Sequence, residues 1–245
     1  MKSLRVAVVA ALLMNGCART PETVSPLVRL APGCAQQDVR LTIVGDSLAR
    51  GWGASVPQNS FASLIYDDVR RRFPKTTMRN LGIPGATSDE IARAEVGRIE
   101  RDECSLVVIV SGANDVQRLY TPRHFRASYT KLLGAIRARV PHAAVVVIGL
   151  PDVSLSPRIP WFLKPFESRL SKDGSASIAE AAREYGAAFV PLYDLSREEA
   201  YRSQSLLSAD GIHPNDAGYR IMAAAVWAQI STSSILSNGV TLFGR

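Results

Sequence analysis

Short apolar runs alternate with longer amphipathic segments along most of the chain. Each apolar run ends at a polar or turn-forming residue, as strands buried on both faces of a parallel sheet do. The segments between the runs repeat apolar residues at intervals of three or four positions, which indicates amphipathic helices. We expect strands at 41–44, 76–80, 106–110, 144–149 and 187–191. We expect helices at 61–73, from a cap at Ser88 onward, at 122–139, at 167–185 with a break near 173–174, and from a cap at Asn215 to about residue 230.

This alternation of strands and helices predicts an α/β domain with a parallel sheet and right-handed crossover helices. The chain has 245 residues, which suits one such domain preceded by a removable leader. Hydrophobic residues make up 47% of the chain and charged residues 21%. This composition supplies a full core and does not indicate extended disorder.

The first 16 residues have the pattern of a bacterial export signal. Two basic residues precede an apolar stretch at 6–14, which is too short to span a bilayer as a helix. Asn15 and Gly16 then lead into Cys17, and a small residue before a cysteine at this place resembles a lipobox. We therefore expect lipid attachment at Cys17, with an ordinary secretory leader as the alternative. No later stretch is long and apolar enough to span a membrane.

These features divide the chain into a lipoprotein-type signal peptide at 1–16, a proline-containing tether at 17–40, a folded domain at 41–232 and a C-terminal tail at 233–245. We expect the mature protein in the bacterial cell envelope, on the periplasmic side of a membrane that it contacts through the lipid anchor. A secreted or soluble periplasmic form is the alternative. The formal charge of +7 is compatible with an anionic envelope surface, and an ordinary solvated basic face is the alternative. No basic patch is interleaved with aromatic residues, so a nucleic-acid partner is not expected.

The first expected strand ends abruptly in Gly45-Asp46-Ser47. In open α/β sheets ligands bind at the carboxyl ends of the strands, and this is where Ser47 should lie. Serine is frequent at helix N-caps, so the local pattern is compatible with a cap as well as with a nucleophile.

A second polar stretch near the end of the chain favours the nucleophile. Asp210 stands three residues before His213 in a turn-rich segment. A serine hydroxyl becomes a nucleophile when a base takes its proton and a third group, usually a carboxylate, orients that base. Ser47, Asp210 and His213 therefore predict a catalytic triad in that chain order.

Two further strand-to-loop transitions supply candidate donors for an oxyanion. Asn114 follows the third expected strand, and Gly82 and Gly85 follow the second. Acyl transfer needs N–H donors where negative charge develops. The Asn114 side chain and the backbone amides of Ser47 and of a glycine in the second loop would supply them.

Four motifs stand in an order that resembles the blocks of the SGNH (GDSL-type) hydrolases: Gly-Asp-Ser-Leu at 45–48, the glycine loop at 82–88, Gly-Ala-Asn-Asp at 112–115 and Asp-Gly-Ile-His at 210–213. The resemblance covers about residues 41–230. It implies Ser47 as nucleophile, His213 as base, Asp210 as orienting acid, and an oxyanion hole of Ser47, Gly85 and Asn114. Gly85 is preferred to Gly82 because Gly-x-Thr-Ser at 85–88 is closer to the family pattern.

The resemblance implies a three-layer α/β/α, flavodoxin-like fold with five parallel strands in the order 2-1-3-4-5. It also implies a cofactor-free serine esterase that hydrolyses acyl or acetyl esters of small molecules or glycans through an acyl-enzyme. Thioesterase or glycan O-deacetylase activity on the same fold is an alternative, as is a binding lipoprotein of the envelope without turnover. No histidine or cysteine stands in a metal-ligand motif, so no metal site is expected.

Two cysteines and three aromatic residues complete the candidates. In the implied strand order the first and third strands are neighbours, and Cys34 and Cys104 precede them, so we expect a disulfide in an oxidising compartment. Two buried thiols are the alternative. Trp52, shortly after Ser47, is a candidate wall of the substrate pocket. Trp161 and Phe162 lie in a segment that leaves the carboxyl end of the fourth strand and are further candidates, with a packed surface loop as the alternative.

Overall fold

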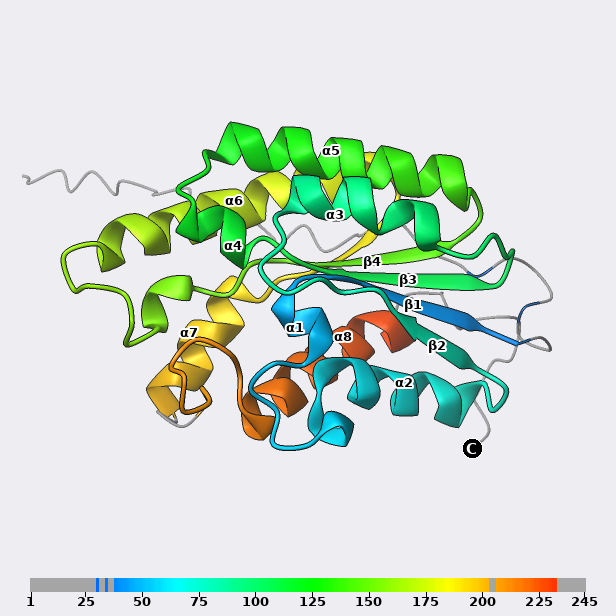
Figure 1. Cartoon of the computed structure of the whole chain (residues 1–245), viewed down its shortest axis with the longest axis horizontal. Helices are drawn as coiled ribbons and strands as arrows, with labels where there is room; N and C mark the ends of the chain where they lie inside the picture. The colour runs from blue at the N-terminus through cyan, green and yellow to red at the C-terminus, as the bar shows by residue number, and fades with distance from the viewer. Residues whose placement is uncertain (1–29, 31–33, 35–37, 203–205, 233–245) are drawn as a thin grey trace, which may run out of the picture.

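The computed structural model describes residues 30, 34, 38–202 and 206–232 of the chain (Figure 1). In this part of the chain five parallel strands form one sheet in the order β2-β1-β3-β4-β5, which confirms the fold and strand order that the family resemblance implies. The strands are β1 (Arg40–Gly45), β2 (Thr77–Asn80), β3 (Ser105–Val110), β4 (Ala144–Ile148) and β5 (Ala188–Val190). Each begins and ends within one residue of its expected position.

The central strand shows why the sheet is buried on both faces. All residues of β3 are buried, and successive side chains point to opposite faces. Val107 and Ile109 pack into the core on one face. Leu106, Val108 and Val110 pack into the core on the other. Because each face needs apolar side chains, the strand reads in the sequence as one continuous apolar run.

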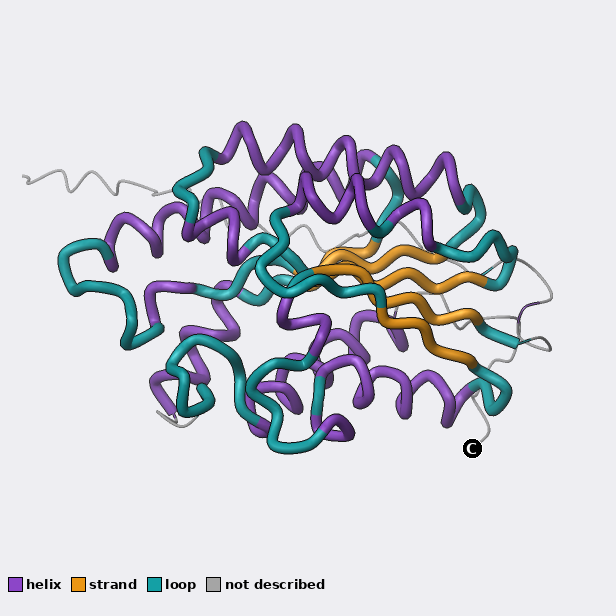
Figure 2. The backbone as a smooth tube through the Cα atoms, in the orientation of Figure 1, coloured by secondary structure: helices purple, strands orange, loops and turns teal. Residues whose placement is uncertain are grey.

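Helices cover both faces of this sheet, which gives the three layers visible in Figure 2. Residues of α3, α5 and α6 fill one core, and residues of α2 and α8 fill the other. The helices are α1 (Ser47–Arg50), α2 (Phe61–Arg72), α3 (Ser88–Ala94), α4 (Ala113–Gln117), α5 (Pro122–Arg139), α6 (Lys164–Glu184), α7 (Tyr193–Arg202) and α8 (Asp216–Thr232). Short 3₁₀ turns are η2 (Pro57–Asn59), η3 (Val96–Arg98) and η4 (Val153–Leu155).

The break expected in the fourth helix was wrong. Helix α6 continues through Asp173 and Gly174 to Glu184. A Cβ at Gly174 would lie 3.0 Å from the side chains of Leu150 and Phe125. The glycine therefore permits close packing of α6 on its neighbours and does not mark a helix end.

A disulfide joins Cys34 to Cys104 at the amino edge of the sheet, with 5.3 Å between the two Cα atoms, which confirms the predicted bridge. Cys104 directly precedes β3, and its carbonyl accepts a hydrogen bond of 3.0 Å from the Arg40 amide at the start of β1. Leu30, Cys34 and Val39 are buried in one core. The packed part of the protein thus includes residues that the sequence placed in the tether.

The expected signal peptide at 1–16, the lipidation site Cys17, the tether up to residue 29 and the tail at 233–245 lie outside the described residues. These parts of the organisation stay predictions. Among the helices that the structure describes, none combines the length and apolar character needed to cross a bilayer.

Candidate active site

Strand β1 ends in a turn that presents Ser47. Gly45 has a φ of +150°, and a Cβ there would stand 1.9 Å from the Val110 carbonyl oxygen, so this turn requires glycine. The Asp46 side chain accepts a hydrogen bond of 2.9 Å from the Leu48 amide and caps α1. Asp46 therefore takes the capping role, and the Ser47 hydroxyl is not needed for it.

The loop between α7 and α8 brings a histidine and a carboxylate to this turn. His213 Nε2 lies 2.9 Å from Ser47 Oγ. His213 Nδ1 lies 2.7 Å from Asp210 Oδ2. With its proton on Nδ1, the ring donates to the carboxylate and accepts from the serine hydroxyl. The structure thus brings together the three residues of the expected triad, although His213 is 166 positions from Ser47.

Donors surround the Asp210 carboxylate. Its Oδ1 accepts hydrogen bonds from the Ser208 hydroxyl at 2.8 Å and from the amides of Ile212 and His213 at 2.8 and 2.9 Å. Partial burial acts to raise the pKa of Asp210, but the bonds from the His213 ring and these other donors outweigh it and hold the pKa well below its ordinary value. Asp210 is therefore ionised at neutral pH and orients the imidazole.

The segment after α1 packs against the His213 loop. Gly53 has a φ of +93°, and a Cβ there would lie 2.4 Å from the Pro214 carbonyl oxygen, so glycine permits the two loops to approach. The rings of Trp52 and His213 meet edge to face with 5.5 Å between centroids. Tyr219 donates a hydrogen bond of 2.6 Å to the Trp52 carbonyl. Trp52 therefore stands beside the triad residues, as a wall of a substrate pocket must.

Asn114 links the two loops that carry the expected oxyanion amides. Its Nδ2 donates to the Ala86 carbonyl at 3.0 Å and lies 3.4 Å from Asp46 Oδ2. Ala86 follows Gly85, and Asp46 precedes Ser47, so one side chain contacts the neighbours of both amides. One Nδ2 proton is held by Ala86. The other has only the long contact to Asp46 among the described residues and is available to a stronger acceptor.

The two glycines of the second loop differ in their surroundings. The Gly82 amide donates to Asn80 Oδ1 at 3.0 Å, and a Cβ at this position would lie 2.7 Å from the Ala49 side chain. Gly85 has a φ of +79° and open space around it, and its amide has no hydrogen-bond partner in the part of the chain that the structure describes. An amide that receives an oxyanion must be unpaired, which favours Gly85 over Gly82.

Three carboxyl groups lie buried behind the turn after β1. Glu95 accepts a hydrogen bond of 2.9 Å from the Gly45 amide, and Asp115 accepts hydrogen bonds from the Ser88 hydroxyl and amide. Burial raises the pKa of Asp46 to about 7 and that of Glu95 to about 8. Burial also raises the pKa of Asp115, against the hydrogen bonds from Ser88. Because a desolvated negative charge is costly, Asp46 and Glu95 retain protons to a higher pH than exposed carboxyl groups do.

Sequence reasoning missed two residues that support the site, Glu95 and Ser208. Glu95 is a single acid in a short charged segment, and nothing in its neighbours signals burial. Ser208 stands two positions before Asp210 and reads as an ordinary turn residue. Among the described residues no group of three or more His, Cys, Asp or Glu side chains is arranged to hold a metal ion.

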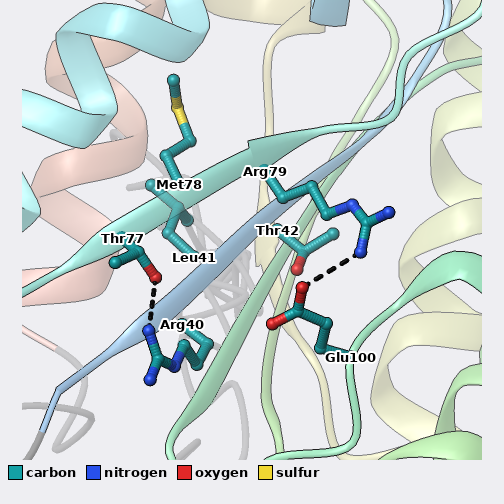
Figure 3. A pocket seen from close by; sticks show the side chains of 7 residues that line it. All are labelled: Arg40, Leu41, Thr42, Thr77, Met78, Arg79 and Glu100. Carbon is teal, nitrogen blue, oxygen red and sulfur yellow. Dashed lines mark hydrogen bonds and ion pairs between the residues drawn. The ribbon is translucent and has the colours of Figure 1, made fainter.

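Trp161 and Phe162, the other two expected pocket residues, lie largely in solvent, with exposed fractions of 81% and 63%. Neither lines the cavity of about 310 Å³ that Figure 3 shows at β1 and β2, which is lined by Arg40, Leu41, Thr42, Thr77, Met78, Arg79 and Glu100. Neither lines a second cavity of about 230 Å³ near Asp102 and His142. Both cavities lie toward the amino edge, away from Ser47, so the candidate site rests on the geometry of Ser47, His213 and Asp210 and not on either cavity.

Comparison with known proteins relates this chain to one family. A family model described as the GDSL-like lipase/acylhydrolase family matches residues 43–221. Thioesterase 1/protease 1/lysophospholipase L1 of Escherichia coli K12 is 26% identical over 175 residues, which cover 71% of this chain and 75% of that protein. GDSL-like esterase Rv1075c of Mycobacterium tuberculosis is 29% identical over 197 residues, which cover 76% of this chain and 60% of that protein. The crystal structure of TesA has the same fold, with a TM-score of 0.63 at 23% identity over 78% of this chain and 97% of that one.

Proposed function

The chain belongs to the GDSL-like lipase/acylhydrolase family, and on that premise we propose that it hydrolyses carboxylic esters through an acyl-enzyme formed on Ser47. The family and its esterase and thioesterase relatives make it a GDSL-type ester hydrolase. The observation that carries the finer proposal is the hydrogen-bonded series from Ser47 Oγ to His213 at 2.9 Å and from His213 to Asp210 at 2.7 Å.

In the first half of the reaction, Ser47 Oγ attacks the ester carbonyl while His213 Nε2 takes its proton. The bond from the carbonyl carbon to the alkoxide then breaks, and His213 returns the proton to the departing alcohol. Asp210 remains ionised and stabilises the imidazolium that exists between these two transfers. In the second half, His213 takes a proton from water, the water oxygen attacks the acyl-enzyme, and the carboxylic acid leaves as Ser47 recovers its proton.

The negative charge that develops on the carbonyl oxygen needs donors fixed in advance. We assign this role to the amides of Ser47 and Gly85 and to the Nδ2 proton of Asn114 that makes only the long contact to Asp46. The support for this assignment is that the Asn114 side chain contacts the residues next to both amides. The bond to Ala86 holds that side chain before substrate arrives, so little reorganisation is needed in the transition state.

Reaction with a fluorophosphonate probe and hydrolysis of nitrophenyl esters test the proposal. The parent enzyme should be labelled, and Ser47→Ala should lose both labelling and, by about 10⁴ to 10⁶, turnover, with its thermal unfolding nearly unchanged. Ser111→Ala is a matched control, since Ser111 is buried at the carboxyl end of β3 and its hydroxyl has no hydrogen-bond partner among the described residues. Labelling of the Ser47→Ala protein, or turnover within tenfold of the parent, would contradict the proposal.

A thioester is the second candidate substrate, because the similar protein of Escherichia coli is named a thioesterase. The same attack by Ser47 would expel a thiolate in place of an alkoxide. A comparison of kcat/KM for an acyl-CoA and a nitrophenyl ester of equal acyl length separates the two. An acetylated oligosaccharide in the same panel tests the glycan ester.

We also propose that the protein is anchored in the bacterial envelope through a lipid at Cys17. The support is the sequence pattern of basic residues, apolar stretch and small residue before the cysteine. Cys17→Ser should block processing or release the protein from the membrane fraction, since stable anchoring needs lipid chains. A wholly soluble parent protein whose mature N-terminus is not a modified Cys17 would contradict this.

A further inference from the structure

The segment between η4 and α6 exposes neighbouring aromatic rings. Trp161 and Phe162 have the highest exposed fractions of the large hydrophobic side chains in the described part of the chain, 81% and 63%. Their rings meet edge to face with 5.9 Å between centroids. Phe166, in the first turn of α6, is 53% exposed. Soluble proteins rarely leave such rings together in water, so these three residues, the aromatic tip, indicate a binding surface.

Hydrogen bonds attach this segment to the loop that carries the triad acid. Ser156 Oγ donates to the Gly211 carbonyl at 2.6 Å, and Arg158 Nε donates to the Asp210 carbonyl at 2.9 Å. Lys164 Nζ donates to two carbonyl groups of the same segment at 2.8 and 3.0 Å. In Figure 1 the segment forms the left-hand end of the molecule, before α6 begins. The hydrogen bonds therefore fix the segment that carries the aromatic tip against the loop of Asp210 and Gly211. A partner that binds the aromatic tip would lie close to that loop.

Cations border the aromatic tip. Arg158 precedes it, and Arg169 and Lys172 follow it on α6 at intervals of three residues, which places them on one side of the helix. All three side chains are exposed. Of the nearby acids, Asp173 pairs with Arg169 at 2.6 Å, and Glu167 is buried. Aromatic rings at an end with cations behind them suit a lipid surface, where rings enter the interface and cations meet anionic headgroups.

We propose that the aromatic tip docks this protein on an anionic lipid surface, with Trp161 and Phe162 in the interface and Arg158, Arg169 and Lys172 toward the headgroups. Because the segment is bonded to the triad loop, docking brings the candidate site to a surface that holds acyl esters. The substrate class that follows is a lipid ester, and this consequence rests on the proposed esterase function.

The fluorescence of Trp161 tests the docking without reference to turnover or to an anchor at Cys17. The chain has three tryptophans, so the full-length protein with Trp52→Phe and Trp227→Phe reports Trp161 alone. With phosphatidylglycerol vesicles we expect a blue shift and quenching by brominated acyl chains, and with phosphatidylcholine vesicles a much weaker effect. Unchanged emission with both vesicles overturns the proposal. Emission that shifts with protein concentration in the absence of vesicles assigns the aromatic tip to a second copy of the chain and also overturns it.

Flotation with vesicles measures how much each side chain contributes to membrane binding. In a Cys17→Ser background, Trp161→Ala with Phe162→Ala should weaken binding to anionic vesicles by at least about tenfold, because two rings no longer leave water. Val56→Ala is the control, since it trims an apolar side chain that is 46% exposed outside the aromatic tip. Lys172→Gln should weaken binding about fivefold at low salt, and only with anionic vesicles. Equal flotation of parent and double variant overturns the proposal.

A Ser47→Ala protein separates this proposal from the esterase proposal. It should float with anionic vesicles as the parent does, because the aromatic tip is unchanged. If the parent enzyme docks and hydrolyses no ester, the esterase proposal fails and docking stands. If it hydrolyses nitrophenyl esters and does not dock, docking fails alone.

Discussion

The two edges of the sheet use polar groups in opposite ways. At the carboxyl edge three carboxyl groups are buried with raised pKa values, directly behind the turn that presents Ser47. At the amino edge the charged groups form partly exposed ion pairs, Arg40 with Asp102 at 3.6 Å and Arg79 with Glu100 at 3.0 Å (Figure 3), and the disulfide lies beside them. Exposed ion pairs contribute little, whereas buried charges are costly. The buried carboxyl groups at the carboxyl edge therefore lower the stability of the fold beside the candidate active site. At the amino edge, the disulfide stabilises the fold.

Asp210→Asn should give the largest effect and tests the carboxyl edge. His213 loses the carboxylate that orients it, so we expect kcat for a nitrophenyl ester to fall about 10⁴-fold. The low pKa of Asp210 means that its ionised form stabilises the folded state, so urea unfolding should show a loss of stability as well. Asp102→Asn is the matched control at the amino edge, because its carboxylate also accepts a backbone amide, that of Cys104, at 2.7 Å. The control should keep the kcat of the parent. An Asp210→Asn enzyme as active as the control would make Asp210 a turn residue only.

Removal of the disulfide tests whether the amino edge of the sheet contributes stability and not activity. The bridge joins residues separated by 70 positions, and Cys34→Ser with Cys104→Ser should lower the free energy of unfolding by roughly 4 kcal/mol in the chain-entropy description. At room temperature the folded variant should keep kcat, because the cross-link lies at the far edge from Ser47. Urea unfolding and ester hydrolysis on the same preparation measure both quantities. A loss of kcat without a loss of stability would contradict the assignment of a stabilising role to the amino edge.

Asn114→Ala should lower kcat by about 10² to 10³ and change KM little, because an oxyanion donor acts mainly in the transition state. Asn114→Asp keeps the shape of the side chain and removes both N–H donors, so it should lose at least as much. Steady-state kinetics on one nitrophenyl ester measure the two variants. An effect on KM alone would assign Asn114 to substrate binding.

The smallest effect concerns the pH dependence of stability. Burial raises the pKa of Glu95 from 4.5 to about 8 and that of Asp46 from 3.8 to about 7. At a pH between the ordinary pKa of such a group and its raised pKa in the folded protein, the folded chain keeps a proton that the unfolded chain has released. The free energy of unfolding should therefore fall as the pH rises through this window.

Glu95→Gln removes one of these titrations and should make the fall shallower. Glu100→Gln, in the exposed pair with Arg79 at the amino edge, should leave the slope unchanged. Urea unfolding at several pH values between the two Glu95 pKa values gives the slopes. A parent protein whose stability rises with pH across this window would show that the buried carboxyls are ionised.

The sequence predicted most reliably the buried strands and the motifs that follow them. Apolar runs predicted the buried strands β1, β3 and β4 within one residue, because a strand buried on both faces needs apolar side chains on each face. The partly exposed edge strand β2 has the sequence Thr-Met-Arg-Asn and shows no such run. The motifs at strand ends predicted which loops meet, since parallel strands bring their carboxyl ends to one edge. The contact between Ser47 and His213 follows from that topology although the residues are far apart in the chain.

The remaining features depend on contacts that no local pattern encodes. Thr87, and not the expected Ser88, caps α3, and Glu90 accepts hydrogen bonds from the Thr87 amide and hydroxyl. Both residues are good caps, and only the backbone path decides between them. Helices α1 and α4 have four and five residues, too few to show a helical period. The role of Glu95 follows only from the structure, in which its carboxyl group accepts a hydrogen bond from the amide of Gly45, 50 positions away in the chain.

The bridge between Cys34 and Cys104 also decides what a protease leaves behind. The closed ring contains β1, α2, β2 and α3, and with them Ser47 and Gly85. A single cut inside the ring, for instance at the exposed turn around Pro57, leaves both pieces covalently joined. A single cut between Cys104 and His213 leaves the piece with His213 attached by noncovalent contacts alone. In an oxidising compartment the part of the chain that contains Ser47 therefore stays one covalent molecule after a cut inside the ring, and the part that contains His213 separates covalently from it after a cut between Cys104 and His213.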